Sequence, residues 1–300
     1  MTEDDFLKDL FAQLPEPDAS ITVPNGDDSA AYIPTPGMHQ LLACDQLIEG
    51  RHYLADTCPQ RAGAKLIKRN LSDMAAMGAT PRYSIISCNV NPNCTEEWLK
   101  KFHFGLLEEA QKFEVQLIGG DLAVSEGPNA FSLTICGESK KPIKRTGSEE
   151  GDLLFATGQF GLSFPSEHHL DFTPRINEGK YLANYAKAMI DITDGLLMDS
   201  ERLLKQAETS LDLELNCKNI PLRQSNGSTA SIIQALSDGE DYELIFAINP
   251  RDENSLTKNW PFNTLLTKIG AFKKGTGKIL NEKQIPLNSQ KNKGFDHFSS

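Results

Sequence analysis

Short apolar segments that end in acidic residues recur along this chain and are separated by stretches of helical periodicity. Residues 41–44 run into Asp45, residues 115–118 precede Asp121, and residues 188–192 lead to Asp194. Each apolar run has the length and composition of a strand. Residues 60–78 instead place apolar side chains three and four positions apart, which predicts a helix. The chain is therefore predicted to consist of strands and helices joined at acidic turns.

The helix predicted over residues 60–78 carries one of these acidic positions at its end. Gly78 is the residue type that ends helices in a left-handed cap. Asn70 and Asp73 lie three residues apart and therefore share one face of the helix. A lone carboxylate on a helix is ordinarily a solvated surface group. Asp73 is a candidate functional residue only because similar carboxylates occur elsewhere in the chain.

The recurring carboxylates could form a cluster that handles phosphate and metal ions. They are Asp27 with Asp28, Asp45, Asp73, Asp121, Asp191 with Asp194, and Glu240 with Asp241. Converging carboxylates repel one another unless cations lie among them. Mg²⁺ suits such a site, because it takes oxygen ligands and is usually held by one or two carboxylates plus substrate phosphates. Asp and Gly are also common in solvated turns, so the spacing alone leaves both interpretations open.

Composition sets broad limits on the class of protein. The 300 residues are 39% hydrophobic and 24% charged, as in a globular protein of about two domains. The polar, turn-rich residues 142–151 are the predicted boundary. A net charge of −11 argues against a nucleic-acid or anionic membrane partner, and no apolar run approaches a membrane span of about 20 residues. Six cysteines without a CxxC pattern are expected to be reduced in a cytoplasmic protein.

Other common site motifs are absent from the sequence. There is no phosphate-binding GxxxxGK[ST] loop, no GxGxxG dinucleotide fingerprint and no GxSxG nucleophile turn. His168 and His169 stand in a Pro-bounded segment, residues 159–178, that is predicted to be a loop. A histidine pair without a third ligand is a weak metal signal, so these two residues are expected to be ordinary loop side chains.

Taken in order, the acidic segments resemble thiamine-monophosphate kinase, of the superfamily that includes aminoimidazole ribonucleotide synthetase and selenophosphate synthetase. The resemblance runs nearly end to end. The matching stretches are Gly26-Asp27-Asp28, Asp45 with Glu49-Gly50-Arg51-His52-Tyr53, Asn70-Leu71-Ser72-Asp73-Met74-Ala75-Ala76-Met77-Gly78-Ala79, Leu117-Ile118-Gly119-Gly120-Asp121, Arg145-Thr146-Gly147, Ala188-Met189-Ile190-Asp191-Ile192-Thr193-Asp194-Gly195-Leu196, Gly239-Glu240-Asp241-Tyr242-Glu243-Leu244 and Gly294-Phe295-Asp296-His297-Phe298.

This resemblance implies a fold and a reaction. The fold would be α/β (α+β) with two domains, residues 1–141 and residues 142–300. The mixed sheet of the N-terminal domain would pair with its copy across a homodimer interface, and the C-terminal domain would be an α/β sandwich. The reaction would be thiamine monophosphate plus ATP giving thiamine diphosphate plus ADP. Several Mg²⁺ ions would neutralise the phosphates and align an in-line transfer.

The resemblance also implies roles for individual residues, carried over position by position. The implied Mg²⁺ ligands are Asp28, Asp45, Asp73, Asp121, Asp191 and Asp194. ATP contacts would come from Gly120, Asp121, Arg145 and Thr193. The thiamine part would contact His52, Glu240 and Phe295, whose ring could face a cationic ring or could simply pack in the core.

Some residues depart from the family pattern. Ala43 and Cys44 replace a Ser-Thr pair before Asp45, and Leu122 and Ala123 replace hydroxyl residues after Asp121. Asp238 stands in place of a Gly and Asn25 in place of an apolar residue, and the segment after Gly158 is shortened. We therefore expect an active kinase with weaker metal or ATP binding than a typical member. The alternatives are another ATP-dependent enzyme of the superfamily, or a non-catalytic relative that binds nucleotide or thiamine phosphate.

Overall fold

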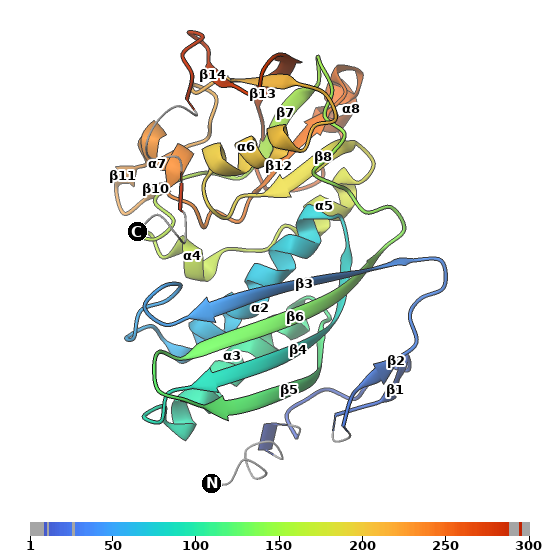
Figure 1. Ribbon diagram of the computed structural model, residues 1–300, viewed down its shortest axis with the longest axis vertical. Coiled ribbons are helices and arrows are strands. Elements are labelled where there is room, and N and C mark those ends of the chain that lie inside the picture. The colour runs from blue at the N-terminus through green and yellow to red at the C-terminus, as the bar shows by residue number, and fades with distance from the viewer. Residues whose placement is uncertain (1–8, 11, 26–27, 288–293, 296–300) are drawn as a thin grey trace. The chain divides into compact units, whose positions relative to one another are not determined.

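The computed structural model describes residues 9–10, 12–25, 28–287 and 294–295 (Figure 1). The chain divides into two compact units, Met1–Met74 with Ala79–Lys140 and Ala75–Gly78 with Lys141–Ser300. Strands and helices occur in both, so a mixed α/β architecture with several sheets is confirmed. Among the described residues, no helix combines the length and the apolar character needed to cross a membrane.

The first unit is built on a four-stranded sheet with the strand order β3-β6-β4-β5. Its strands are β3 (His39–Ile48), β4 (Thr80–Val90), β5 (Gln116–Val124) and β6 (Ala130–Ser139). β4 and β5 run parallel, whereas β6 pairs antiparallel with both β3 and β4. A short antiparallel ribbon, β1 (Ile21–Val23) with β2 (Ala31–Tyr32), precedes the sheet in the sequence.

Helices α2 (Pro59–Ala76) and α3 (Glu96–Lys112) lie along one face of this sheet (Figure 1). Phe102 of α3 stacks on Phe131 of β6 with ring centroids 4.0 Å apart. Thr95 caps α3 by accepting a hydrogen bond from the Trp98 amide at 3.2 Å. The apolar positions that predicted α2 are buried: Leu66, Ile67, Leu71, Met74 and Ala75.

The opposite face of the sheet is only partly covered by described residues. Near one end, Tyr32 of the β1–β2 ribbon packs against Tyr83 and Cys136. Further along, Leu42 and Ile85 remain 74% and 47% exposed. This partly covered face is called the open face below.

The Gly119-Gly120-Asp121 segment lies inside β5, so the prediction that the strand ends there is wrong. The parallel pairing with β4 continues through it, placing Gly120 opposite Ile86 and Asp121 opposite Ser87. A side chain at Gly120 would come within 2.7 Å of the Ile86 carbonyl oxygen. The two glycines therefore permit a close approach of the two strands instead of ending the strand.

The second unit contains a six-stranded sheet with the order β14-β9-β13-β7-β12-β8. The strands are β7 (Leu153–Thr157), β8 (Ala186–Asp191), β9 (Leu211–Leu215), β12 (Leu244–Ile248), β13 (Leu266–Lys274) and β14 (Ile279–Asn281). All neighbours pair antiparallel except β14 with β9. The smaller elements are β10 (Gln224–Ser225), β11 (Ser228–Thr229), the 3₁₀ turn Pro250–Asp252 and α8 (Glu253–Lys258).

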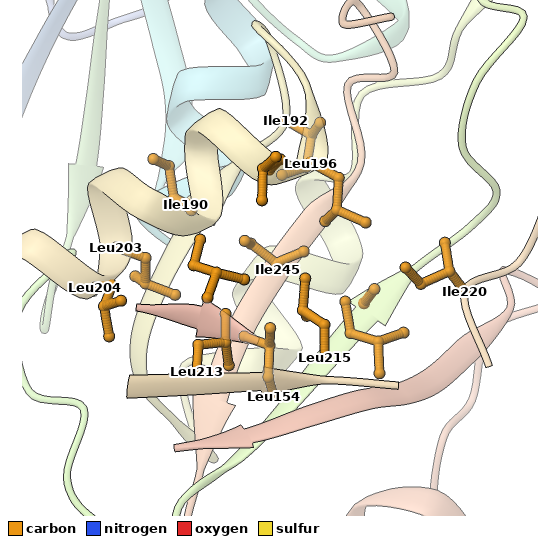
Figure 2. Packing of buried hydrophobic residues seen from close by; sticks show 14 of the residues in the cluster. Leu154, Ile190, Ile192, Leu196, Leu203, Leu204, Leu213, Leu215, Ile220 and Ile245 are labelled. Atoms are coloured by element: carbon orange, nitrogen blue, oxygen red, sulfur yellow. The ribbon is translucent and has the colours of Figure 1, made fainter. Parts of the chain in front are cut away.

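Helices α6 (Leu196–Lys205) and α7 (Ile232–Ser237) cover one face of this sheet and form the core there. Figure 2 shows side chains of α6, among them Leu203 and Leu204, packing with side chains of the strands. Alternate strand residues point toward the helices, as expected for a sheet with one helix-covered face. The labelled residues are Leu154, Ile190, Ile192, Leu196, Leu203, Leu204, Leu213, Leu215, Ile220 and Ile245, all buried.

Residues 159–178 are not simply a loop, contrary to the prediction. They contain α4 (His168–Asp171) and the start of α5 (Ile176–Leu182). Leu170 and Ile176 are buried at 4% and 5% exposure. Helices of four and seven residues are too short to show a hydrophobic period in the sequence. Tertiary burial stabilises them instead.

A substitution at Gly63 tests the close packing of α2 on α3. A side chain there would lie 1.9 Å from the Phe102 carbonyl oxygen. This oxygen belongs to the backbone of α3, so moving it away would cost free energy. Gly63→Ala should therefore lower the free energy of unfolding by about 1–3 kcal/mol. That result would reverse the usual helix-propensity gain of about 1 kcal/mol for Gly→Ala.

Urea unfolding of the full chain measures this effect. Ala64→Ser is the control, because Ala64 is on the same helix and partly exposed; its cost should stay near about 0.5 kcal/mol. A Gly63→Ala variant at least as stable as the unmodified protein would contradict the packing described here.

Candidate functional site

A cleft on the open face of the first unit contains three of the predicted site residues. It has a volume of about 540 Å³ and is lined by Asp28, Gly120 and Asp121. Side chains of β3, β4 and β6 form its floor, among them Leu42, Ile85, Ser87 and Thr134. Gly26 and Asp27 of the same predicted turn lie outside the described residues. The structure thus brings two carboxylates and a close backbone approach to one cavity of ligand size.

Asp45 lies on the other face of the same sheet, toward α2. Successive strand residues alternate between faces, and Asp45 shares its side with buried Leu47 rather than with exposed Leu42. Its carboxylate lies 3.5 Å from the Arg69 guanidinium. Its amide donates to the Asn70 side-chain oxygen at 3.2 Å. Asp45 is therefore tied to α2, and the cleft on the open face does not include it.

Asp73 and His52 also belong to the first unit. Asp73 is partly exposed on α2, one turn beyond Asn70. His52 is buried at 9% exposure, and its Nδ1 accepts the Ile48 N–H at 2.9 Å. In the neutral ring the proton is therefore on Nε2. Lys65, itself fully buried, donates to the His52 carbonyl oxygen at 2.7 Å.

The carboxylates of the cleft suit a hard divalent cation. Of the described residues, no three His, Cys, Asp or Glu side chains are placed to hold a metal ion by themselves. Asp28 and Asp121 nevertheless line the same cleft. Mg²⁺ is commonly bound by one or two carboxylates together with water and substrate phosphate. The donor set of the cleft fits Mg²⁺ on that basis.

Four other predicted residues are joined by backbone hydrogen bonds in the second unit. The Glu240 amide donates to the Thr193 carbonyl oxygen at 2.7 Å, and the Phe295 amide donates to the Asp194 carbonyl oxygen at 2.9 Å. Asp191 ends β8 just before them and is buried at 3% exposure. Separate parts of the sequence are therefore assembled at one end of β8.

Glycines make this assembly possible. Gly239 has φ +73°, and a side chain on it would lie 2.8 Å from the Thr193 carbonyl oxygen. A side chain on Gly294 would lie 2.2 Å from the Asp194 carbonyl oxygen. Any larger residue would separate the segments that carry Glu240 and Phe295 from the segment that carries Asp194. Phe295 itself is 43% exposed, so it is not a core residue of the described structure.

Asp199 and Arg202 of α6 hold the Thr193-Asp194 turn, although neither is among the site residues predicted from the sequence. The Asp199 carboxylate accepts the amide hydrogens of Thr193 and Asp194 at 2.9 and 3.0 Å. Arg202 lies 2.5 Å from both the Asp194 and the Asp199 carboxylates. Burial, opposed by Arg202, raises the pKa of Asp199 to about 6. An acidic residue in the first turn of α6 was the only sequence signal for this arrangement.

Two buried ion pairs support the segment around Glu240. Arg175 binds the Glu243 carboxylate through two nitrogens at 2.8 and 2.6 Å. Arg223 lies 3.0 Å from Asp241, which is 1% exposed. Glu240 and Tyr242 adopt positive φ angles of 53° and 51°, which are rare for residues other than glycine. Buried side chains therefore hold a strained backbone beside Glu240.

Arg145, the basic residue predicted to contact ATP, lies between β6 and β7. Its side chain is exposed. It precedes Gly147, whose φ of +112° suits a turn.

The protonation of Asp241 should make stability depend on pH. Burial raises its pKa from 3.8 to about 7, although Ser163 and Arg223 act in the opposite direction. The folded state therefore binds a proton that the unfolded state has lost, and this contribution to stability disappears as pH rises through about 7. Asp241→Asn, which imitates the protonated carboxyl, should flatten the fall in stability between about pH 5 and about pH 8.

Urea unfolding at the two pH values measures the difference between Asp241→Asn and the unmodified chain. Asp56→Asn changes an exposed aspartate and is the control. An identical pH dependence in all three proteins would contradict the assignment of the proton to Asp241.

Known proteins are similar to this chain in sequence and in fold. Residues 26–139 match the family described as AIR synthase related protein, N-terminal domain. A thiamine-monophosphate kinase of Buchnera aphidicola subsp. Schizaphis graminum is 34% identical over 304 residues, covering 91% of each chain. That of Haemophilus influenzae is 32% identical over 329 residues, covering 99% of this chain and 98% of the relative.

A solved structure described as AaThiL complexed with AMPPCP and TMP superimposes with a TM-score of 0.75. It is 27% identical, and the match covers 98% of this chain and 95% of that one. The similarity in sequence and in fold thus extends over nearly the whole chain, well beyond the matched N-terminal region. The chain therefore belongs to the thiamine-monophosphate kinase family.

Proposed function

We propose that this chain transfers the terminal phosphoryl group of ATP to thiamine monophosphate, giving thiamine diphosphate and ADP. The observation that carries the proposal is the nearly full-length similarity to thiamine-monophosphate kinases. The related structure with AMPPCP and TMP supports it, because AMPPCP is an unreactive analogue of ATP. The described site adds carboxylates in a cleft large enough for a small molecule.

The reaction requires little general acid–base catalysis from the protein. The attacking group is a phosphate oxygen that is already ionised at neutral pH, so a strong general base is unnecessary. The difficulty is to bring two anionic phosphates together on a protein with a net charge of −11. Bound Mg²⁺ would supply the neutralising charge on the phosphates. The chain's own task is to hold the ions and to orient both substrates.

We assign roles to the residues as follows. Asp28 and Asp121 hold Mg²⁺ in the cleft of the first unit, and Gly120 lets ATP approach the backbone. The remaining Mg²⁺ ligands are Asp45, Asp73, Asp191 and Asp194. ATP also contacts Arg145 and Thr193. The thiamine part of the substrate contacts His52, Glu240 and Phe295. The backbone bonds around Asp194 support this grouping within the second unit, because they bring Glu240 and Phe295 to the same turn.

The departures from the family pattern weaken binding without removing the carboxylates. Cys44 is exposed on β3 where the family has a hydroxyl residue, and Ala43 offers only its backbone oxygen. Leu122 and Ala123 likewise offer no hydroxyl oxygen after Asp121. We expect lower affinity for Mg²⁺ or ATP than in a typical member for this reason.

We also propose that two copies of the chain form a homodimer through the open face of the first unit. Within each copy, we propose that residues 1–141 and 142–300 are the two domains. Exposed apolar residues of monomeric proteins are usually scattered, whereas Leu42 and Ile85 share one sheet face. All six cysteines are free thiols, which supports a reducing, cytoplasmic location.

The release of ADP tests the proposed reaction. We expect ADP from the purified protein with ATP, Mg²⁺ and thiamine monophosphate, and none after the addition of a chelator. Thiamine and aminoimidazole precursors replace thiamine monophosphate as controls. ADP formed only with an aminoimidazole precursor would indicate another enzyme of the superfamily. Nucleotide binding without ADP from any substrate would indicate a non-catalytic relative.

Removal of one proposed ligand tests the role of the carboxylates. Asp73→Ala should reduce kcat/KM at least about 100-fold while leaving the thermal unfolding midpoint nearly unchanged, because Asp73 is partly exposed. Asp56→Ala, at an exposed aspartate outside the proposed site, should retain full activity. Unchanged turnover in Asp73→Ala would contradict its assignment as a metal ligand.

The oligomeric state tests the proposed interface. Leu42→Lys should weaken self-association at least about tenfold, because it places charge in an apolar interface. Ile233→Lys is the matched control, since Ile233 on α7 is 65% exposed and lies in the second unit. Analytical ultracentrifugation measures both variants. A monomeric unmodified chain, or equal association in the two variants, would rule out this interface.

A further inference from the structure

The first unit contains a second cavity. Its volume is about 390 Å³, which lies within the range of small-molecule pockets. The residues that form it follow β3, end β4, start α3 and connect β5 to β6. None of the site residues assigned above lines this cavity.

Two aromatic rings form one wall of this cavity. Tyr53 and Trp98 both line it, with ring centroids 6.2 Å apart and ring planes inclined by 28°. Trp98 also stacks on Phe102 at 5.5 Å and on Phe131 at 6.0 Å. These contacts hold the indole in place, while its half-buried surface remains available to the cavity. The wall is therefore a fixed aromatic surface.

Glu49 supplies a negative charge beside that wall. Its carboxylate accepts a hydrogen bond from the Asn129 side chain at 2.8 Å. No lysine, arginine or histidine in the described part of the chain forms an ion pair with it. Carboxylates are almost never fully buried unless they are paired, and Glu49 is partly buried. This one has amide hydrogen bonds but no counter-charge.

The Tyr53 hydroxyl is a second uncompensated group at the cavity. Tyr53 is only 1% exposed, and within the described residues its hydroxyl has no hydrogen-bond partner. Burial, followed by the charge of Glu49, raises the pKa of this hydroxyl. The Asn129 amide acts weakly in the opposite direction, without the geometry of a hydrogen bond. Burial and Glu49 also raise the pKa of the Cys94 thiol.

We propose that this cavity binds a small organic cation, held against the accessible surface of Trp98 beside Tyr53 and neutralised by Glu49. Aromatic faces attract cations through their ring quadrupole, and tryptophan does so most strongly. The side-chain amides of Asn91, Asn93 and Asn129 also border the cavity and can bind polar substituents. A bare metal ion would make no use of the aromatic wall.

An anion is the less suitable occupant, although the start of α3 borders the cavity. Helix starts favour anions. Here the Trp98 amide is already bound by Thr95, and Glu96 and Glu97 form ion pairs with Lys100 and Lys101. The uncompensated carboxylate of Glu49 would repel an anion as well. The charges of the described residues therefore select a cation.

Two sources could supply this chemistry. One is the thiazolium ring of a thiamine phosphate, and the other is a separate quaternary amine. The proposal does not depend on the kinase reaction, because ligand binding is measured without turnover.

Saturation-transfer NMR on the full chain tests the proposal, with choline as the probe. Choline should bind, and its uncharged isostere 3,3-dimethylbutan-1-ol should bind at least about tenfold more weakly. Glu49→Gln should weaken choline binding by a similar factor while keeping an acceptor for Asn129. Trp98→Leu should also weaken it. Glu97→Gln removes an equal charge from an exposed residue and is the control.

Competition distinguishes the two sources. If thiamine monophosphate displaces choline and Glu49→Gln raises its KM, the cavity binds the substrate ring; if not, it binds a separate amine. Either result supports the cation site. Equal binding of choline and its isostere, equal affinities in Glu49→Gln and Glu97→Gln, or no transfer to choline would overturn it. A failed ADP assay leaves these binding results unaffected.

Discussion

Repulsion among carboxylates is the constraint on which the site of this protein depends. The chain carries a net charge of −11, and several of the proposed site carboxylates follow apolar segments. In the described structure, arginines balance some of them. Arg69 lies 3.5 Å from Asp45, and Arg202 lies 2.5 Å from Asp194. We infer that substrate phosphates and Mg²⁺ complete this balance during the reaction.

The same repulsion explains why particular backbone conformations are required near the site. Gly239 and Gly294 allow three segments to meet at Asp194, while Asp199 fixes the turn by accepting two amide hydrogens. The strained residue Glu240 is held beside buried ion pairs. A backbone held in one conformation keeps the acidic side chains that it carries in fixed positions. The buried polar contacts provide that rigidity.

Much of the fold could be predicted because its signals are local. Apolar spacing predicted α2, whose regularly spaced apolar positions are buried in the structure. The prediction failed at Gly120, where pairing with β4 overrides the usual effect of glycine, and in α4 and α5, which are too short to show a period. The acidic residues of the site could be predicted because they recur beside apolar segments of the sequence. Lys65 and Arg202 could not be predicted, because only tertiary contacts distinguish them from surface residues.

The most direct test of the charge-balance account is to count bound divalent ions in solution. Electron paramagnetic resonance with Mn²⁺ in place of Mg²⁺ measures free and bound ions in the presence of AMPPCP and thiamine monophosphate. The account predicts more than one ion bound per chain with both ligands present, and fewer in Asp28→Asn or Asp194→Asn. Binding of both ligands without any divalent ion, or an ion count unchanged in both variants, would contradict it.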